Sequence, residues 1–175
     1  FKQLQLKKYS MPKSETQTLV EMLELSRDLT KFYLSKLKGK DEHKVFELDG
    51  KQFNSISWLI AHITVSENWL LLVCTGGKHV KIPWARQYGL GSTPPKKEDA
   101  PSFDEVLKYF KEVHQTAINH ISQLTDEDLA KPTTNGVTFG GEDSIRAIIK
   151  HAVRHECAHA GQLGWLCKLF DVETI

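Results

Sequence analysis

Three histidines recur at intervals of four residues in the segment HAVRHECAHAGQLGWL, residues 151–166. They are His151, His155 and His159, and in an α-helix such spacing puts side chains on one face. A neutral imidazole is a common ligand for divalent transition metals, and it is costly to bury without a partner. The spacing therefore predicts either a hydrogen-bond network or a metal site.

The three histidines of this segment cannot all bind one ion. His151 and His159 lie about 12 Å apart along a helix, whereas the nitrogens on one zinc-like ion are only about 3.3 Å apart. Two histidines four residues apart can share an ion. The apolar residues Ile148, Leu163 and Leu166 lie on the same side as the pair His155 and His159, which is therefore the inward pair. His151 is expected beside the site, orienting His155 by a hydrogen bond, or else on the surface.

A third ligand is expected from His62 in the segment NSISWLIAHITVSENWLL, residues 54–71. Helical periodicity aligns His62 with Trp58 and Trp69 on an inward face. A single histidine on such a face is more often a hydrogen-bonded core residue than a ligand, but the pair in the last helix favours the metal site. Cys157 falls on the opposite side of its helix and is not expected to bind the ion. The remaining histidines are treated as ordinary residues: His43, His79, His114 and His120.

The sequence HECAH, residues 155–159, also matches the short HExxH pattern of zinc proteases, in which Glu156 would act as the base. The extended pattern needs a glycine and a third histidine where this chain has Gln162 and Trp165. The other form of the pattern takes a glutamate far downstream, and only Glu173 is available. Proteolysis is therefore not expected. Glu156 is instead a candidate for moving a proton in another reaction, or a salt-bridging residue at the helix margin.

The elements that must position these residues are four segments with helical periodicity, at roughly 14–38, 55–75, 102–124 and 143–171. The first is expected to bury one apolar stripe, which comprises Leu19, Leu23, Leu29, Phe32, Tyr33 and Leu37. Turns are expected at Asp49-Gly50, as a short hairpin, and at Asn135-Gly136. The pattern predicts an all-α fold, a four-helix bundle that forms a single domain over residues 1–175.

The connection between the second and third helices, residues 76–101, is long and rich in glycine and proline. Connections of that size are uncommon unless they cross a bundle or cover a site. We therefore expect at least one crossover. Its residues Trp84, Arg86 and Tyr88 could lie over the metal and hold a small anionic molecule, although Trp84 could also simply close the end of the bundle.

The composition restricts which classes of partner and which cellular compartment are expected. The 175 residues contain 23 Lys and Arg against 22 Asp and Glu, so the formal charge is +1 and no basic field for nucleic acid is expected. The longest purely apolar run, WLLLVC at 69–74, is far shorter than the roughly 20 residues that cross a bilayer. Three cysteines without regular spacing favour reduced thiols. These features predict a soluble, cytoplasmic protein with no nucleic-acid and no membrane partner.

The two histidine segments together resemble the DinB-like (YfiT-like) metalloenzyme superfamily, over nearly the whole chain. In that family, W-L-x-x-H of the second helix and H-x-x-x-H-x-G-Q of the last supply three histidines to one divalent ion. The matching residues are His62, His155 and His159, followed by Gly161-Gln162. The resemblance also implies that Gln162 lies beside the ligands. One departure is the sequence Ala158-His159-Ala160, where the family often has H-H-R.

The resemblance implies an up-down-down-up bundle with the long crossover between helices two and three, and frequently a homodimer. It implies a divalent cofactor but not one reaction, since members include thiol-dependent transferases and isomerases and many proteins without known activity. Three neutral imidazoles suit nickel or zinc, and our hypothesis is a metal-dependent thiol S-transferase or isomerase. Such an enzyme would use a low-molecular-weight thiol, such as bacillithiol or mycothiol, on a small-molecule substrate. The alternative is a non-enzymatic bundle whose structural metal ties helix two to helix four. A fourth ligand from the protein would favour the structural metal, since catalytic sites keep one position open.

Overall fold

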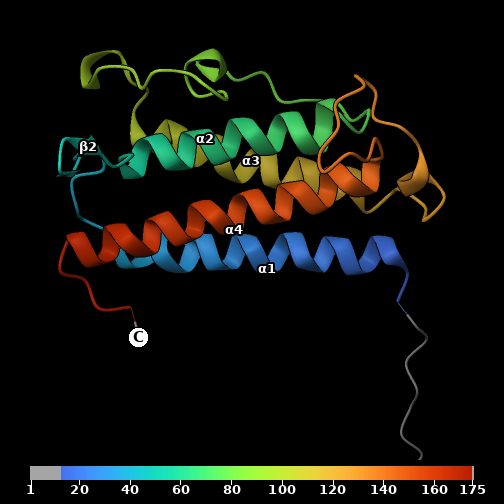
Figure 1. Cartoon of the computed structure of the whole chain (residues 1–175), viewed down its shortest axis with the longest axis horizontal. Helices are drawn as coiled ribbons and strands as arrows, with labels where there is room; N and C mark the ends of the chain where they lie inside the picture. Colours follow the sequence, from blue (N-terminus) through green and yellow to red (C-terminus); the bar gives the residue numbers. More distant parts are fainter. Residues whose placement is uncertain (1–12, 175) are drawn as a thin grey trace, which may run out of the picture.

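The computed structural model describes residues 13–174, and four long helices form the body of that part of the chain (Figure 1). They are α1 (Glu15–Lys36), α2 (Ile56–Asn68), α3 (Phe103–Ile121) and α4 (Ile145–Leu169). Each follows a serine N-cap whose hydroxyl accepts a hydrogen bond from the backbone N–H three residues on; the caps are Ser14, Ser55, Ser102 and Ser144. The four predicted helices are confirmed, and local capping signals mark where each begins.

The helices run up, down, down and up. In Figure 1, α1 and α4 run side by side in one direction, and α2 and α3 run in the other. Because α2 and α3 are parallel, the chain must return along the whole bundle between them. Residues 76–101 do so, passing over α2 with two short 3-10 turns, η2 (Ala85–Gln87) and η3 (Lys97–Asp99). The all-α bundle and its long crossover are thus as predicted.

Short elements join the other helices. Between α1 and α2, β1 (Glu47–Leu48) pairs with antiparallel β2 (Lys51–Gln52) through Asp49 and Gly50, whose φ angles are 50° and 71°. A two-residue hairpin turn of this kind needs positive φ at both positions, which explains the Asp-Gly pair. Before α4 lie the 3-10 turn η4 (Asp128–Ala130) and the turn at Gly136, which has a φ of 69°. Both expected turns are present.

The end of α2 widens into a π-helical turn, η1 (Trp69–Val73). Here backbone N–H groups bond to carbonyls five residues back: Cys74 N to Trp69 O at 2.9 Å and Gly77 N to Leu72 O at 2.7 Å. Leu70, Leu71 and Leu72 are all buried by this turn. The continuous helical stretch Ile56–Val73 is long and apolar enough to cross a membrane by length and composition, and 67% of it is buried inside the bundle. Its hydrophobicity is that of a core helix.

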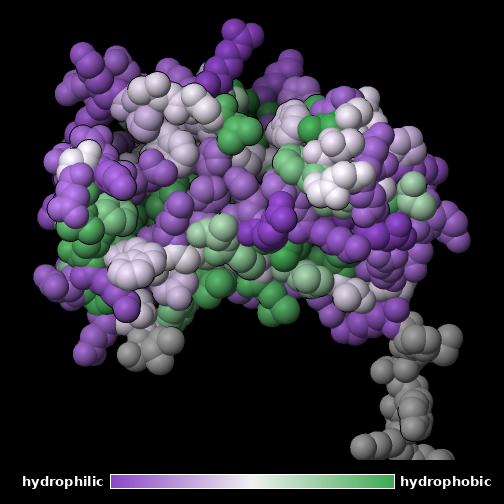
Figure 2. All heavy atoms as spheres, viewed as in Figure 1, coloured by the Kyte–Doolittle hydropathy of each residue, from purple (hydrophilic) through white to green (hydrophobic). Residues whose placement is uncertain are grey.

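The buried face of α1 differs from the expected stripe. Leu19, Leu23 and Leu37 are buried as expected, but Leu29 and Phe32 are 39% and 38% exposed. Figure 2 shows hydrophobic residues along the lower edge of the molecule, where α1 lies. The exposed apolar side chains of α1 are Met22, Leu25, Leu29 and Phe32. The expectation for Leu29 and Phe32 was wrong because three polar residues in the middle of α1 point inward instead.

Those three residues are Ser26, Arg27 and Thr30, which are all at most 3% exposed. The hydroxyl groups of Ser26 and Thr30 bond back to carbonyls of the preceding helical turn. Arg27 finds acidic partners on α2 and α4. Partners from other helices therefore decide which face of α1 is buried.

Candidate metal centre

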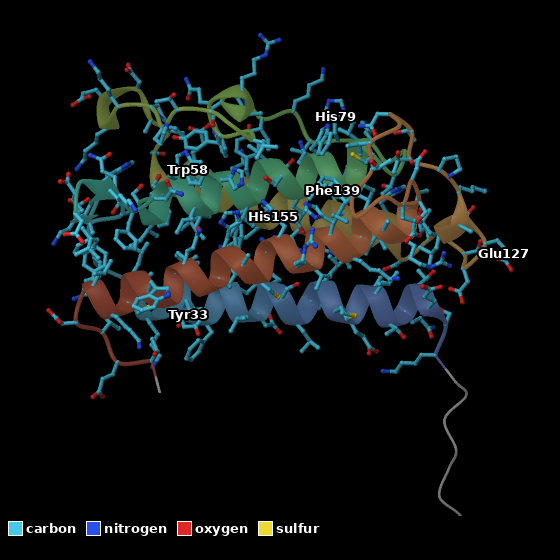
Figure 3. The ribbon with its side chains drawn as sticks, in the orientation of Figure 1. Tyr33, Trp58, His79, Glu127, Phe139 and His155 are labelled. Atoms are coloured by element: carbon cyan, nitrogen blue, oxygen red, sulfur yellow. The ribbon has the colours of Figure 1, made fainter. Side chains whose placement is uncertain are left out.

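His62 of α2 meets His155 and His159 of α4 in the interior between the two helices, and Figure 3 shows His155 on the side of α4 that faces α2. The Nε2 atom of His155 lies 3.2 Å from that of His62 and 3.2 Å from that of His159. The three ligand atoms all lie within 4.8 Å of one another. The two separations of 3.2 Å match the roughly 3.3 Å between imidazole nitrogens around one tetrahedral ion. The structure therefore brings together all three residues predicted as ligands.

Hydrogen bonds orient two of the three rings. Nδ1 of His62 donates to the backbone carbonyl of Tyr88 at 2.7 Å, and Nδ1 of His159 donates to Oε1 of Gln162 at 2.8 Å. Because both partners are acceptors, the ring proton belongs on Nδ1, and Nε2 keeps its lone pair. Trp58 stacks on His62 with ring centroids 4.7 Å apart and planes 8° from parallel. The ligand face of His62 is thus fixed from two sides.

The environment also keeps these imidazoles neutral. Burial, and then the neighbouring histidines, lower the pKa of His155 to about 3. Burial is the main cause that lowers the pKa of His62 and of His159 as well. At neutral pH all three therefore present unprotonated nitrogens. Three neutral imidazoles fit a divalent transition metal such as nickel, zinc, copper or iron.

Two further residues were predicted beside the site. Gln162 contacts His159 directly, through the hydrogen bond described above. His151 lies near His155, with ring centroids 6.0 Å apart, but its own contacts lead elsewhere. It stacks on Phe139 at 3.6 Å and accepts a hydrogen bond from Arg154 at 2.7 Å. In the described part of the chain, His151 therefore flanks the triad without a hydrogen bond to it.

The long connection covers α2 in a different way from the one expected. Tyr88 is buried, and it reaches the site through its backbone carbonyl rather than its ring. Trp84 is buried against Tyr109 of α3 and donates from Nε1 to Glu105 at 3.3 Å, as expected of a residue that closes the bundle. Arg86 is exposed. Sequence reasoning missed the Tyr88 carbonyl because every residue carries one, and only the path of the chain decides which carbonyl is used.

Glu156, the candidate proton carrier, faces α1. Its Oε1 accepts from Thr30 Oγ1 at 2.9 Å and lies 2.9 Å from Nε of Arg27; its Oε2 accepts from the Arg27 guanidinium at 3.2 Å. Glu156 is only 5% exposed. These contacts favour the salt-bridging alternative, although deep in the bundle rather than at its margin. Proton transfer by Glu156 stays a prediction.

Arg27 is the centre of a buried polar network that connects all four helices. It also pairs with Glu67 of α2, and its guanidinium donates to the carbonyl of Phe110 in α3 at 3.1 Å. Glu67 in turn lies 2.7 Å from Nδ1 of His114. Sequence reasoning left His114 among the ordinary histidines, and nothing in its local pattern indicates these partners.

The two buried carboxylates of this network differ in their titration. Burial opposes the charge of Glu67, but Arg27 and His114 together hold the pKa of Glu67 below its usual value. Burial dominates at Glu156 and raises its pKa, despite the opposing charge of Arg27. Glu67 is therefore the firmly ionised partner of Arg27.

Four helices in up-down-down-up order, with a histidine triad between the second and the fourth, define a helical bundle with a candidate metal site. The chain belongs to the DinB superfamily, whose family model matches residues 22–163. The resemblance drawn from the histidine motifs is thereby confirmed. No curated protein is a significant match to the sequence.

Several solved structures share the fold. A conserved protein from Enterococcus faecalis is 12% identical, with a TM-score of 0.62, over 88% of this chain and 95% of that one. An uncharacterised protein from Escherichia coli UTI89 is 13% identical, with a TM-score of 0.60, over 93% and 98%. The colibactin self-resistance protein ClbS, solved in complex with double-stranded DNA, is 14% identical, with a TM-score of 0.56, over 91% and 98%. At these identities the similarity shows the fold alone.

The ClbS complex corrects one expectation. We expected no nucleic-acid partner from a formal charge of +1, yet a protein of the same fold is solved with double-stranded DNA. The exclusion is wrong because net charge sums over the whole surface, whereas phosphate contacts depend on where the basic residues lie. The small-molecule substrate, the homodimer, the absence of a membrane partner and the cytoplasmic location stay predictions.

Proposed function

We propose that the protein binds one divalent metal ion through His62, His155 and His159 and acts as a metal-dependent transferase or isomerase that uses a low-molecular-weight thiol. The observation that carries this proposal is the convergence of three neutral imidazoles, with Nε2 of His155 lying 3.2 Å from Nε2 of both His62 and His159. Two of the rings are held in the ligand tautomer by Tyr88 and Gln162. Such oriented partners support metal affinity in other histidine sites.

Nickel or zinc is the proposed ion, because neutral imidazoles suit both. When bound, the ion supplies Lewis acidity and lowers the pKa of a thiol that approaches it, so that a nucleophile forms at neutral pH. The chain's own residues position the ligand His62 and the incoming substrate, and they shield the site. Trp58 covers one face of His62, and Ser66 places its hydroxyl 3.5 Å from Nε2 of His62, where it can donate to an incoming substrate. Glu156 holds α4 against α1 through Arg27 and Thr30.

The competing function is a structural metal that only ties α2 to α4. Structural sites are filled by protein ligands, whereas catalytic sites keep one position for water or substrate. In the described part of the chain, the cluster of metal-ligating side chains contains the three histidines alone. A tetrahedral ion held by them would have one position left, which supports the catalytic proposal.

The test is a screen of the metal-loaded protein with several biological thiols against a model electrophile, beside His159→Ala. His79→Ala is the matched control, because His79 is an exposed histidine of the long connection. We expect thiol-dependent turnover in the wild type and in His79→Ala, and loss of it in His159→Ala. Thiols should also change the visible spectrum of the cobalt-substituted protein. If no thiol gives turnover above that of His159→Ala and none changes that spectrum, the catalytic proposal fails and the metal is structural.

A further inference from the structure

A cavity of about 180 Å³ lies beside the first turn of α2, next to the tryptophan that stacks on His62. Three segments form its walls: the linker after α1, the start of α2 and the long connection. Phe53, Tyr88 and Pro95 supply apolar surface, while Ser57 and Trp58 line it from α2. The cavity is therefore adjacent to the metal centre and shares two of the residues that support His62, Trp58 and Tyr88.

Two buried polar atoms in this wall lack a hydrogen-bond partner among residues 13–174: Oγ of Ser57 and Nε1 of Trp58. Ser57 is only 2% exposed. Arg27 Nε also lacks a well-aligned hydrogen bond, but it lies 2.9 Å from the Glu156 carboxylate. An unpaired buried donor costs about 1–3 kcal/mol, so two of them in adjacent residues of one cavity wall call for an acceptor.

The charges around the cavity indicate what kind of acceptor fits. An indole N–H can only donate, and a serine hydroxyl can donate as well. The cavity lies at the N-terminus of a 13-residue helix, where the helix dipole favours negative charge. Lys97 adds a cation, which also lies 3.8 Å from the carboxylate of Asp41, and the described lining itself contains no carboxylate. These features select an anionic group that accepts hydrogen bonds.

The size and the apolar walls indicate the rest of the ligand. A cavity of about 150 Å³ holds benzene, so this one has room for a molecule slightly larger than that. We propose that the cavity binds a small organic carboxylate with a flat apolar body, and that Ser57 Oγ and Trp58 Nε1 donate to its carboxylate. Its role as a substrate site rests on the proposed function, because Trp58 connects it to His62.

Benzoate is the probe, and metal-free protein is the sample. Four tryptophans give four indole N–H signals in a nitrogen-correlated NMR spectrum, and Trp58→Phe identifies the one that belongs to Trp58. We expect benzoate to shift that signal saturably, and the neutral isostere benzamide to bind at least about tenfold more weakly, because hydrogen bonds to charged groups are the stronger ones.

Ser57→Ala separates a binding role from a structural one. Removing an unpaired hydroxyl should leave thermal stability unchanged or raised, while benzoate binding weakens about tenfold, since one hydrogen bond to a charged group is lost. Ser35→Ala, an exposed serine of α1, is the matched control and should change neither. A lower melting temperature for Ser57→Ala with unchanged benzoate binding would show that the hydroxyl serves the fold, and the proposal would fail.

Two other outcomes would also overturn it: no saturable shift with benzoate at tens of millimolar, or equal binding of benzoate and benzamide. The benzoate test uses metal-free protein. If it fails but metal analysis of the wild type still finds one ion per chain, only the carboxylate site is refuted and the metal-site proposal is retained. Conversely, benzoate binding that persists while metal binding fails would leave the carboxylate site standing without the proposed enzyme.

Discussion

Two consecutive residues of α4 serve two buried polar clusters of opposite character. His155 belongs to the histidine triad, and Glu156 belongs to the network around Arg27. In the network, charged side chains of opposite sign form ion pairs. The single side chain of Arg27 contacts residues of α2, α3 and α4. In the triad, three neutral nitrogens face one another, and no member is an anion or a cation.

The Arg27 network is completed by residues of the protein itself, whereas the histidine triad needs a metal ion to complete it. A buried network whose members are all paired fixes the packing of helices, and removing one member leaves the others uncompensated. Nitrogen lone pairs that face one another repel unless a proton or a metal cation lies between them. We therefore expect mutations in the network to act on folding and mutations in the triad to act on metal binding.

The largest expected effect is the loss of metal from His155→Ala, because His155 lies 3.2 Å from both other ligands. Metal analysis of purified protein should find about one ion per chain in the wild type and almost none in this variant. His151→Ala, on the same helix one turn earlier, should keep its metal. The reverse pattern, with metal lost from His151→Ala and kept in His155→Ala, would contradict the ligand assignment.

Next in size is the effect of Arg27→Met on folding. Removing this cation leaves Glu67 and Glu156 buried without their partner, which should lower the free energy of unfolding by about 3–5 kcal/mol. Urea unfolding of the metal-free protein measures it. Lys31→Met, on the exposed side of the same helix, should change the value by less than about 0.5 kcal/mol. A change below about 1 kcal/mol in Arg27→Met would show that the network does not hold the helices together.

A smaller effect is expected from Gln162→Leu, which removes the acceptor for His159 Nδ1. Loss of such an orienting partner typically weakens metal affinity 10–100-fold, while the ligands themselves stay. Competition with a chelator of known affinity measures the change. The control is Gln115→Leu on the surface of α3, which should bind metal like the wild type. An affinity equal to the control would mean that Gln162 does not orient His159.

The smallest effect is the response of the metal-free protein to pH. The pKa of folded His155 is lowered to about 3, so between pH 6.5 and about 3 the unfolded chain binds a proton that the folded chain does not. The contribution of His155 to stability is therefore full above pH 6.5 and is lost as the pH falls toward 3. The slope is at most about 1.4 kcal/mol per pH unit for this proton.

The measurement is the difference in unfolding free energy between the wild type and His155→Ala, followed from pH 7 to pH 5. The variant lacks the titrating group, so the wild type should lose stability faster as the pH falls. Parallel curves for the two proteins would show that His155 is not held neutral by the fold.

The metal centre was largely predictable because its geometry is mostly local. His155 and His159 are four residues apart on one helix, and the apolar periodicity of α4 points both of them inward. Predicting His62 as the third ligand required only the apolar periodicity of α2 and the histidine pair on a second helix that faces it. The order of the helices followed from the length of the 76–101 connection together with the family resemblance.

The Arg27 network was not predictable in the same way. A buried arginine is stable only with partners, and Glu67, Phe110 and Glu156 lie 40, 83 and 129 positions away from it along the chain. Apolar periodicity therefore assigned Leu29 and Phe32 to the core of α1, while the contacts across the bundle turned Arg27 there instead. Long-range pairing overrode the local pattern.

The π-helical turn at Trp69–Val73 makes the downstream end of α2 a place where the chain can change length during evolution. Losing one residue there would convert the wide turn into an ordinary α-helical one and leave the upstream residues His62 and Glu67 in phase with each other. Losing one residue between His62 and Glu67 would instead rotate one side chain relative to the other by about 100° around α2. His62 could then no longer face the triad while Glu67 faces Arg27. Insertions and deletions among relatives are therefore expected to collect after Asn68 and to avoid the stretch before it.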